Sequence, residues 1–332
     1  MFGGGSVEVE RKVNAILRVL SESNGVVGAR LISRELKKHG IDLSERAVRY
    51  HLKLMDERGL TRLVGRDGRQ ITQEGMDELR DALVGDKVGF FINRIEVVSF
   101  RTTFDWRTRA GLVPANVSIF SKDDFPRALK AMAVAFKAGL SVGNLVAVAN
   151  EGERLGERVI PKGRIGFATV CSAVVTGALL KAGVPMDSKF GGILQIKDRK
   201  PLRFAELIYY SGTSLDPSEV FIRGKMTDVI GAAKNGDGKV LANFAEVPGQ
   251  CRSLAEDMTS KLKEVGLGSL MVMGKPGEPV CEAPVDPNRV GVLMLGGLNP
   301  VAAAEEAGIQ AENAAISAVV EYSQLKSFWD LL

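Results

Sequence analysis

The stretch SERAVRYHLKLMDERGL, residues 44–60, has the pattern of an amphipathic helix with a basic outer face. Val48, Leu52 and Met55 recur at helical spacing, so they form one apolar stripe. The polar side chains that fall on the opposite face are Arg46, Arg49, Tyr50 and Lys53. Ser44 is a favourable N-cap, and Gly59 suits the end of the helix. We therefore expect a helix here that buries one side and exposes positive charge on the other.

The flanking segments predict what this helix packs against. A first helix is indicated by an apolar stripe at Val13, Ile16, Leu17 and Leu20. A second is expected from about Gly28 to Lys38, with Leu31, Ile32 and Leu36 facing inward and Gly40 as a left-handed cap. After the third helix, LTRLVGRDGRQIT alternates apolar and polar residues around Asp67-Gly68, which is a hairpin signal. Three helices and a basic-tipped hairpin predict a winged helix-turn-helix domain, at residues 7–84.

Positive charge is concentrated in this segment. Residues 28–69 contain 11 Lys and Arg against 6 Asp and Glu, a net charge of +5, whereas the whole chain carries +4. Phosphate is the natural partner of such a segment, so we expect the third helix to enter the major groove of double-stranded DNA. Arg46, Arg49 and Lys53 would contact guanine edges and phosphates, and Tyr50 the sugar-phosphate chain. Arg66 and Arg69 of the wing would reach the flanking backbone or minor groove.

Two other interpretations of these residues stay open. Winged helices also serve as protein-interaction modules, in which the basic face is simply solvated. His51 is expected at the edge of the core, and a metal-binding role is disfavoured because His39 is the only other histidine in the chain.

Composition bounds the remaining possibilities. A chain of 332 residues with 45% hydrophobic content is long enough for two or three domains with real cores. Its three cysteines include no CxxC pair, which argues against a disulfide scaffold and for a reducing compartment. The opening MFGGGSVEVERK lacks the pattern of a signal peptide, and no apolar run approaches the length of a membrane span. We therefore expect a cytoplasmic, nucleoid-associated protein with no membrane partner.

The other 240 or so residues contain an internal repeat. Aligning the chain with itself at an offset of 125 residues matches many glycines, among them Gly143 with Gly268 and Gly166 with Gly291. The two copies are residues 116–183 and 241–308. Each copy reads as a helix, a short strand, a second strand and a second helix. Whether the copies form one pseudo-symmetric domain or two facing lobes is left open by the sequence.

The segments around the copies complete the predicted architecture. RIEVVSFRTTF, residues 94–104, is expected to be a strand, and KFGGILQIKDRKPLRFAELIYYSG, residues 189–212, a hairpin. The overall expectation is an α/β (α+β) regulatory domain at residues 95–332, built by duplication and joined to the winged helix by a connector at residues 85–94.

The junction between the second strand and second helix of each copy offers a ligand site. In the second copy, LMLGGLNPVAAAEEAG predicts a turn followed by a helix with Asn299 at the N-cap and Pro300 at N1, so that backbone N–H groups point at an anion. The first copy places hydroxyl and thiol groups at the same point. The residues that we expect to bind an effector are Thr169, Cys171, Ser172, Gly296, Gly297 and Asn299. Two such junctions could grip both ends of a dicarboxylate; alternatively, both are tight turns that pack helix on sheet.

The arginine at the start of the second strand of each copy could have either of two roles. Arg164 and Arg289 could bind an anion or pair with Glu157 and Glu282, and we expect the pairing. Cys171 is also compatible with a plain buried thiol. No histidine follows His51, and no Ser-His, Cys-His, HExxH or Walker pattern occurs, so we expect no catalytic residues, no metal, no cofactor and no enzymatic activity.

Several stretches together resemble the archaeal NrpR repressors of nitrogen assimilation. They are RIGFATVCSAVVTGALLKAGVP, KFGGIL, LDPSEVFI, GKVLANFAEVP and VGVLMLGGLNPVAAAEEAGI, following a winged helix. The resemblance implies a dimer or tetramer that binds palindromic operators of nitrogen-fixation and glutamine-synthesis genes and is released by 2-oxoglutarate, bound to the regulatory domain.

One departure from the family pattern matters for partners. Some members carry two tandem regulatory domains, whereas this chain has room for one, so repression is expected to involve a second NrpR-type subunit that contacts the TATA-binding protein. The competing interpretation is a winged-helix corepressor or scaffold whose large domain serves only oligomerisation and protein contacts.

Overall fold

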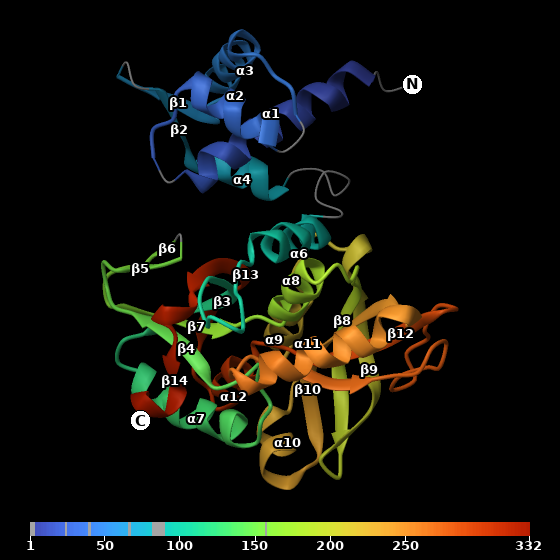
Figure 1. Cartoon of the computed structure of the whole chain (residues 1–332). Coiled ribbons are helices and arrows are strands. Elements are labelled where there is room, and N and C mark those ends of the chain that lie inside the picture. Colours follow the sequence, from blue (N-terminus) through green and yellow to red (C-terminus); the bar gives the residue numbers. More distant parts are fainter. Residues whose placement is uncertain (1–3, 24, 39–40, 66–67, 82–89, 157) are drawn as a thin grey trace. The chain divides into compact units, whose positions relative to one another are not determined.

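The computed structural model describes residues 4–23, 25–38, 41–65, 68–81, 90–156 and 158–332. The chain divides into two compact units, residues 1–87 and 88–332 (Figure 1). Among the described residues, no helix combines the length and apolarity that crossing a membrane requires.

The N-terminal unit is a winged helix. Its elements are α1 (Gly4–Glu22), α2 (Ala29–Lys38), α3 (Glu45–Glu57), β1 (Thr61–Val64), β2 (Gly68–Ile71) and α4 (Gln73–Asp81). β1 and β2 form the antiparallel wing hairpin, and the backbone of Val27 pairs with Arg69 beside it. Three helices and the hairpin were expected; α4, which packs on α1, is an addition.

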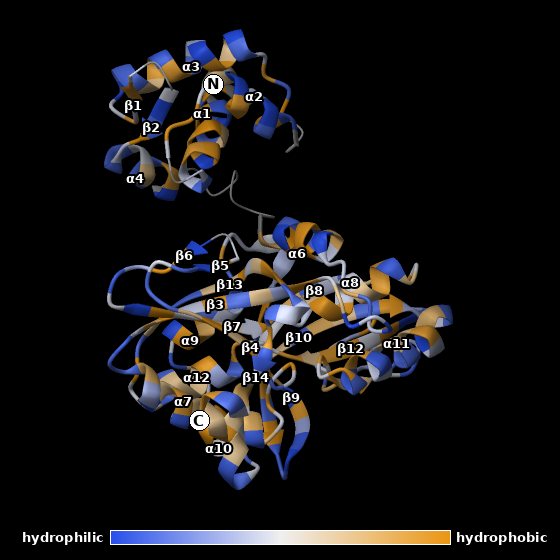
Figure 2. Ribbon diagram, turned by 60° about the vertical axis from the view of Figure 1, so that its left-hand side comes forward, coloured by the Kyte–Doolittle hydropathy of each residue, from blue (hydrophilic) through white to orange (hydrophobic). Residues whose placement is uncertain are grey.

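The core of this unit follows the apolar periodicity of its helices. Val13, Ile16, Leu17 and Leu20 of α1 are fully buried, as are the α3 residues expected to face inward. α3 alternates between hydrophobic and hydrophilic residues, as Figure 2 shows. Leu31 was expected to face inward but is 39% exposed, since the buried stripe of α2 runs through Ile32 and Leu36 instead.

The C-terminal unit contains two five-stranded sheets. One has the order β13-β3-β7-β4-β14 and the other β11-β12-β10-β8-β9, and every pairing described in them is antiparallel. The strands of the first sheet are β13 (Ala311–Glu321), β3 (Leu112–Ser121), β7 (Arg164–Val170), β4 (Leu145–Ala149) and β14 (Lys326–Ser327). Those of the second are β11 (Leu270–Met273), β12 (Arg289–Leu295), β10 (Gly238–Pro248), β8 (Asp187–Lys197) and β9 (Lys200–Tyr209). A short hairpin, β5 (Arg154–Leu155) with β6 (Arg158–Val159), stands apart.

The longer helices pack on these sheets. They are α6 (Phe90–Arg101), α7 (Phe125–Lys137), α8 (Ala173–Lys181), α11 (Arg252–Glu264) and α12 (Asn299–Glu306). Two short helices, α9 (Pro217–Arg223) and α10 (Val229–Asn235), and four single 3-10 turns complete the described part of the unit. The turns are η1 (Tyr210–Gly212), η2 (Gly249–Cys251), η3 (Tyr322–Gln324) and η4 (Phe328–Leu331). The duplicated α/β architecture and the β8-β9 hairpin are therefore confirmed.

The segment RIEVVSFRTTF was predicted to be a strand, and this prediction is wrong. Residues 90–101 form α6, which buries Phe91, Ile95, Val98 and, just beyond its end, Thr102. These positions recur at intervals of three and four, the period of a helix. The connector expected at residues 85–94 thus overlaps α6, and its residues 85–89 lie outside the described part of the chain.

The two repeats are interlocked. In each, a strand, a helix, two strands and a helix form one half (β3 to α8; β10 to α12), and the strand that follows crosses to the other sheet. β8, which follows the first half, pairs with β10, and β13, which follows the second, pairs with β3. The helices cross in the same way, because α7 packs on α12 and α8 on α11. The repeats therefore form one pseudo-symmetric domain and not two separate lobes.

Candidate functional site

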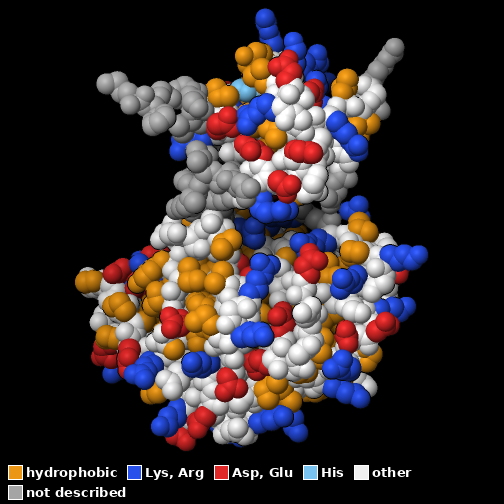
Figure 3. Space-filling model, turned by 180° about the vertical axis from the view of Figure 1, so that it is seen from behind, with side chains coloured by type: hydrophobic (Ala, Val, Ile, Leu, Met, Phe, Trp, Pro, Cys, Tyr) orange, Lys and Arg blue, Asp and Glu red, His pale blue; other side chains and the backbone are white. Residues whose placement is uncertain are grey.

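The outer face of α3 presents the basic side chains that the sequence placed there. Arg46, Arg49 and Lys53 are exposed, and Tyr50 is 62% exposed. Ser44 caps the helix, since its hydroxyl accepts the Ala47 N–H at 3.2 Å. Lys and Arg side chains gather at the top of the N-terminal unit in Figure 3. This geometry suits insertion into a groove of DNA.

Two of these cations have carboxylate partners on the same helix. Arg49 pairs with Glu45, and Lys53 lies 3.9 Å from Glu57. Exposed pairs of this kind contribute about 0.3–0.5 kcal/mol, so a phosphate can replace the carboxylate at little cost. Both cations are therefore available to a polyanion.

The wing differs from expectation in the arrangement of its arginines. Arg69 lies on β2 and its Nε donates to Asp56 Oδ2 at 2.7 Å, with the side chain only 20% exposed. Asp56 also accepts the hydroxyl of Thr61 at 2.6 Å, so it fastens α3 to both wing strands. A contact between Arg69 and DNA stays a prediction and would require this pair to open. Arg66 lies outside the described residues.

His51 lies inside the unit, 7% exposed, at the inner side of α3. Burial, together with the positive charge of Lys12, lowers the pKa of His51 below its usual value. The imidazole is therefore neutral at physiological pH. Among the residues that the structure describes, no group of three or more His, Cys, Asp and Glu is placed to hold a metal ion.

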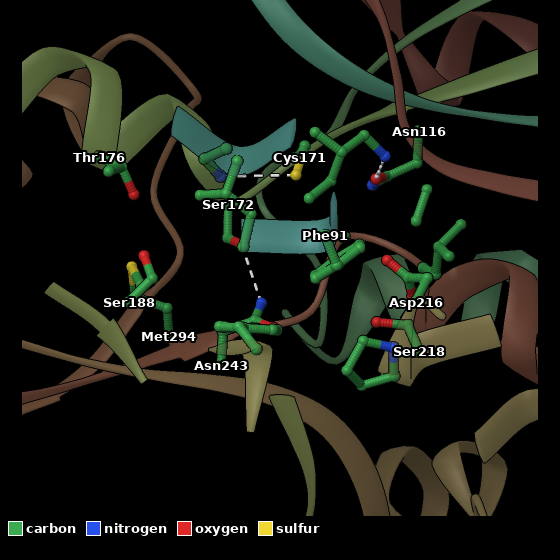
Figure 4. Close-up of a pocket in the computed structure, with 18 of the residues that line it drawn as sticks. Phe91, Asn116, Cys171, Ser172, Thr176, Ser188, Asp216, Ser218, Asn243 and Met294 are labelled. Atoms are coloured by element: carbon green, nitrogen blue, oxygen red, sulfur yellow. Dashed lines mark hydrogen bonds between the residues drawn. The ribbon is translucent and has the colours of Figure 1, made fainter. Parts of the chain in front are cut away.

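The two strand-to-helix junctions meet at one cavity in the C-terminal unit (Figure 4). The first junction contributes Cys171 and Ser172, at the start of α8, and the second contributes Gly297 and Leu298, at the start of α12. The other walls come from α6, β3, β8, β10, α9 and the bulged part of β13. Besides Cys171 and Ser172, the polar residues that line the cavity are Asn116, Thr176, Ser188, Tyr210, Asp216, Ser218 and Asn243.

Two asparagines occupy equivalent positions in the two halves of this cavity. Asn116 lies opposite Thr169 in the β3-β7 ladder, and Asn243 lies opposite Met294 in the β10-β12 ladder, so the two occupy equivalent positions. Asn243 Nδ2 donates to Ser172 Oγ at 2.8 Å, which joins the second repeat to the junction of the first. Asn116 reaches the other junction: a Cβ at Gly297 would lie 2.4 Å from its Nδ2. Each repeat thus supplies an asparagine to the junction of the other.

The asparagines were not predicted as site residues, and the sequence explains why. The repeat offset of 125 aligns Asn116 with Leu241, whereas the ladders make Asn243 its equivalent, a shift of two residues. Only the strand register reveals the pair.

Three of the six predicted effector residues line the cavity and three do not. Cys171, Ser172 and Gly297 lie in its wall. Thr169 is buried outside the lining of the cavity, and its Oγ1 has no hydrogen-bond partner among the described residues. Gly296 packs against Leu241, to whose carbonyl it donates at 2.8 Å.

Asn299 was predicted to be the N-cap of α12, and this prediction is wrong. The cap position is Leu298, and Asn299 is the first residue of the helix. Its side chain is fully buried and makes two hydrogen bonds to the backbone of one residue of β10. Oδ1 accepts the Leu241 N–H at 2.7 Å, and Nδ2 donates to the Leu241 carbonyl at 2.9 Å. Asn299 therefore fastens α12 to the sheet.

The expected pairing of Arg289 with Glu282 is also wrong. Arg289 Nε lies 3.0 Å from Oε2 of Glu246, a carboxylate that is 2% exposed. Lys189 lies 3.4 Å from the same oxygen, so two cations offset the cost of burying it. For Arg164, the expected partner Glu157 lies outside the described residues.

Of the described residues that line the cavity, three are titratable, and all three are buried. Burial raises the pKa of the Cys171 thiol to about 12, so the thiol stays protonated and unreactive. Burial also raises the pKa of Tyr210 well above its usual value. Asp216 is 7% exposed, and burial, with the negative charge of Glu219, raises its pKa to about 7. Its Oδ1 accepts the Glu219 N–H at 3.0 Å and caps α9.

The cavity is narrow. Its accessible volume is only about 40 Å³. One water needs roughly 10–15 Å³, so the cavity holds a few waters, and a larger ligand must part its walls. Phe91 and Ile95 of α6 form one of these walls. α6 is also the first helix described after the segment that links the two units.

Comparison with known proteins finds similar proteins for both units of the chain. Residues 88–327 match the family described as NrpR regulatory domains NRD1 and 2, and residues 14–79 match the Ribonuclease R winged-helix domain. A protein named global nitrogen regulator NrpRI, from Methanosarcina mazei, is 42% identical over 319 residues, which cover 96% of this chain and 98% of that protein.

Longer relatives and one solved structure are also similar. The global nitrogen regulator NrpR of Methanococcus maripaludis is 33% identical over 94% of this chain, which spans only 54% of that protein. A crystal structure of a nitrogen repressor-like protein from Methanococcus jannaschii is 28% identical, has a TM-score of 0.62, and covers 73% of this chain and 98% of its own.

Proposed function

The chain belongs to the NrpR family, and from that premise we propose that it is a DNA-binding repressor of nitrogen-assimilation genes that 2-oxoglutarate releases from its operators. The names of its relatives support a regulatory and non-enzymatic role connected with nitrogen. The winged helix supports DNA as the partner. In this proposal, two copies bind a palindromic operator with their α3 helices about 34 Å apart, one turn of DNA.

The observation that carries the DNA-binding part is the exposed basic face of α3. Arg49 lies at its centre with an exposed, exchangeable carboxylate partner. Replacing it removes one charge-assisted contact without disturbing the core.

The observation that carries the effector part is the meeting of both junctions at one cavity. The first turns of α8 and α12 both border it, so backbone N–H groups and the positive ends of two helix dipoles favour an anion there. An effector with two carboxylates matches this pseudo-symmetric pair. Since the cavity must widen to admit it, Phe91 and Ile95 would move with α6, and α6 leads to the segment that joins the winged helix. A second NrpR-type subunit and the TATA-binding protein complete the proposed set of partners.

The test is a fluorescence titration of the purified protein on a fragment of its own upstream DNA. Arg49→Ala should abolish operator binding or weaken it at least tenfold, while 2-oxoglutarate affinity in calorimetry stays unchanged. Arg80→Ala, an exposed arginine on α4 that pairs with Asp77, is the matched control and should bind normally. Normal binding by Arg49→Ala would show that α3 is not the recognition helix.

The same complex tests the effector. Adding 2-oxoglutarate should release the DNA, whereas succinate and glutamate should not. Tight operator binding that no dicarboxylate reverses would favour the scaffold interpretation, in which the signal arrives through another protein.

A further inference from the structure

The described wall of the cavity is acidic, which is unusual for a site that binds an anion. Asp216 presents a buried carboxyl to it, and none of the described residues that line it is Lys or Arg. An acidic effector bound by backbone N–H groups alone would therefore meet an unneutralised carboxylate at close range, in a region of low dielectric. Figure 4 shows Asp216 and Ser218 on one side of the cavity, with Ser172 and Asn243 joined by their hydrogen bond on another.

The charged and titratable groups around Asp216 do not relieve this conflict. Glu219, on the same helix, adds negative charge, and Arg94 of α6 adds a positive one from a solvent-exposed position. Tyr210 and Cys171, which face Asp216 from η1 and from the start of α8, are both neutral. The cavity-lining residues of β8 and β13 are Ser188, Ala315 and Ile316, which carry no charge.

We propose that Asp216 determines the specificity of this cavity by accepting an acidic effector only together with one proton, which the carboxyl holds while the effector is bound. The protonated carboxyl then donates a hydrogen bond to the ligand instead of repelling it. Atoms and charge balance: the dianionic effector and one proton from solvent enter, and both leave on release. This inference rests on the proposed function, because it assumes an anionic effector in this cavity.

The unliganded protein is poised for such uptake. Because burial raises the pKa of Asp216 from 3.8 to about 7, the folded state favours the protonated form. The resulting contribution to stability is full below the unfolded carboxyl's pKa and is lost as pH rises through about 7. Above that pH the free protein has lost the proton, so binding must recover it, and effector affinity should fall about tenfold per pH unit.

The experiment is calorimetric titration of the full chain with 2-oxoglutarate from about pH 6 to about pH 9, in buffers of different ionisation enthalpy, which counts protons taken up. The test variant is Asp216→Asn, which keeps an N-cap oxygen for Glu219 and a hydrogen-bond donor for the ligand. The matched control is Asp228→Asn: Asp228 caps α10 in the same way, its Oδ1 accepting the Gly231 N–H at 2.9 Å, and it does not line this cavity.

Wild type and Asp228→Asn should take up close to one proton above pH 7 and lose affinity there, whereas Asp216→Asn should take up none and keep a nearly constant affinity. Equal proton uptake by wild type and Asp216→Asn would overturn the inference, and so would an affinity of wild type that rises with pH. If Asp216→Asn alone loses binding while its melting temperature is unchanged, the ionised carboxylate is what the ligand needs, and the inference is again wrong. No binding by wild type at any pH would overturn the proposed effector itself, a result distinct from the other three.

Discussion

At the scale of single residues, two asparagines near the junctions have different tasks: Asn243 is partly exposed and Asn299 is fully buried. Asn243 is a cavity residue whose amide links Ser172 and Tyr210. Asn299 is a structural residue, since both ends of its side chain are used on the Leu241 backbone. These hydrogen bonds are required because the pairing of β10 with β12 ends at Ala242, one residue before Leu241, where the chain of β12 turns into α12. The amide side chain replaces a strand partner that is missing at this point.

Replacing Asn299 should therefore affect stability. Asn299→Ala leaves the buried N–H of Leu241 unpaired, whereas the Leu241 carbonyl keeps the Gly296 N–H. We therefore expect the free energy of unfolding of the C-terminal unit to fall by about 1–3 kcal/mol. Urea denaturation of the full chain measures this change. Asn93→Ala, at an exposed position on α6, is the control and should change little. A loss of effector affinity with unchanged stability would instead make Asn299 a ligand residue.

At the scale of elements, local periodicity predicted most of the structure. The helices α7, α8, α11 and α12 and the strands β4, β7, β11 and β12 all occur where the repeat placed them. α6 was mistaken for a strand because Ile95, Val97 and Val98 are β-branched and favour strands over short windows. The helical recurrence of Phe91, Ile95 and Val98 was available over a longer window.

What sequence could not reveal is which elements meet. The crossing of β8 and β13 depends on pairing partners far apart in the chain, and no local pattern encodes a partner. Asp216 illustrates the same limit at the site. Its Asp-Pro-x-Glu context marks a helix start, as α9 confirms. However, its burial beside two junctions depends on the tertiary arrangement.

The junction of α12 gives a test of close packing between elements. A Cβ at Gly297 would lie 2.4 Å from both Asn116 Nδ2 and the carbonyl oxygen of Val170. Since a backbone carbonyl cannot rotate away, Gly297→Ala should push α12 from β7, lower the free energy of unfolding by about 1–3 kcal/mol and weaken effector binding.

Thermal unfolding and calorimetry of that variant provide the measurement. Gly212→Ala, where no atom beyond the adjacent residues of the chain lies within 4 Å of the new methyl group, is the matched control. An unchanged melting temperature for Gly297→Ala would mean that the two repeats approach each other less closely than this structure has them.

At the scale of the whole molecule, exchange of strands and helices makes the two repeats depend on each other. The first sheet contains β13 from the end of the second repeat, and the second contains β8 from the end of the first. Each core likewise combines both copies: Leu129 and Val301 belong to one cluster, and Val174 and Leu262 to the other. A ligand that binds where the junctions meet contacts both halves at once, so neither half can respond alone.

This interlocking predicts how the chain unfolds. Residues 88–332 should melt in one cooperative transition, separate from that of residues 1–87, because neither sheet is complete until both repeats have folded. Scanning calorimetry of the full chain would show two transitions, of which only the one with the larger enthalpy shifts to higher temperature with effector. Fragments 88–212 and 213–332 should each remain unfolded alone, since the first lacks β13 and β14 of its sheet and the second lacks β8 and β9 of its own, and they should recover a cooperative transition when mixed. A single fragment that melts cooperatively by itself would show that the strand exchange is not needed for folding. The effector would then have to act on one repeat and affect the other through contacts weaker than a shared sheet.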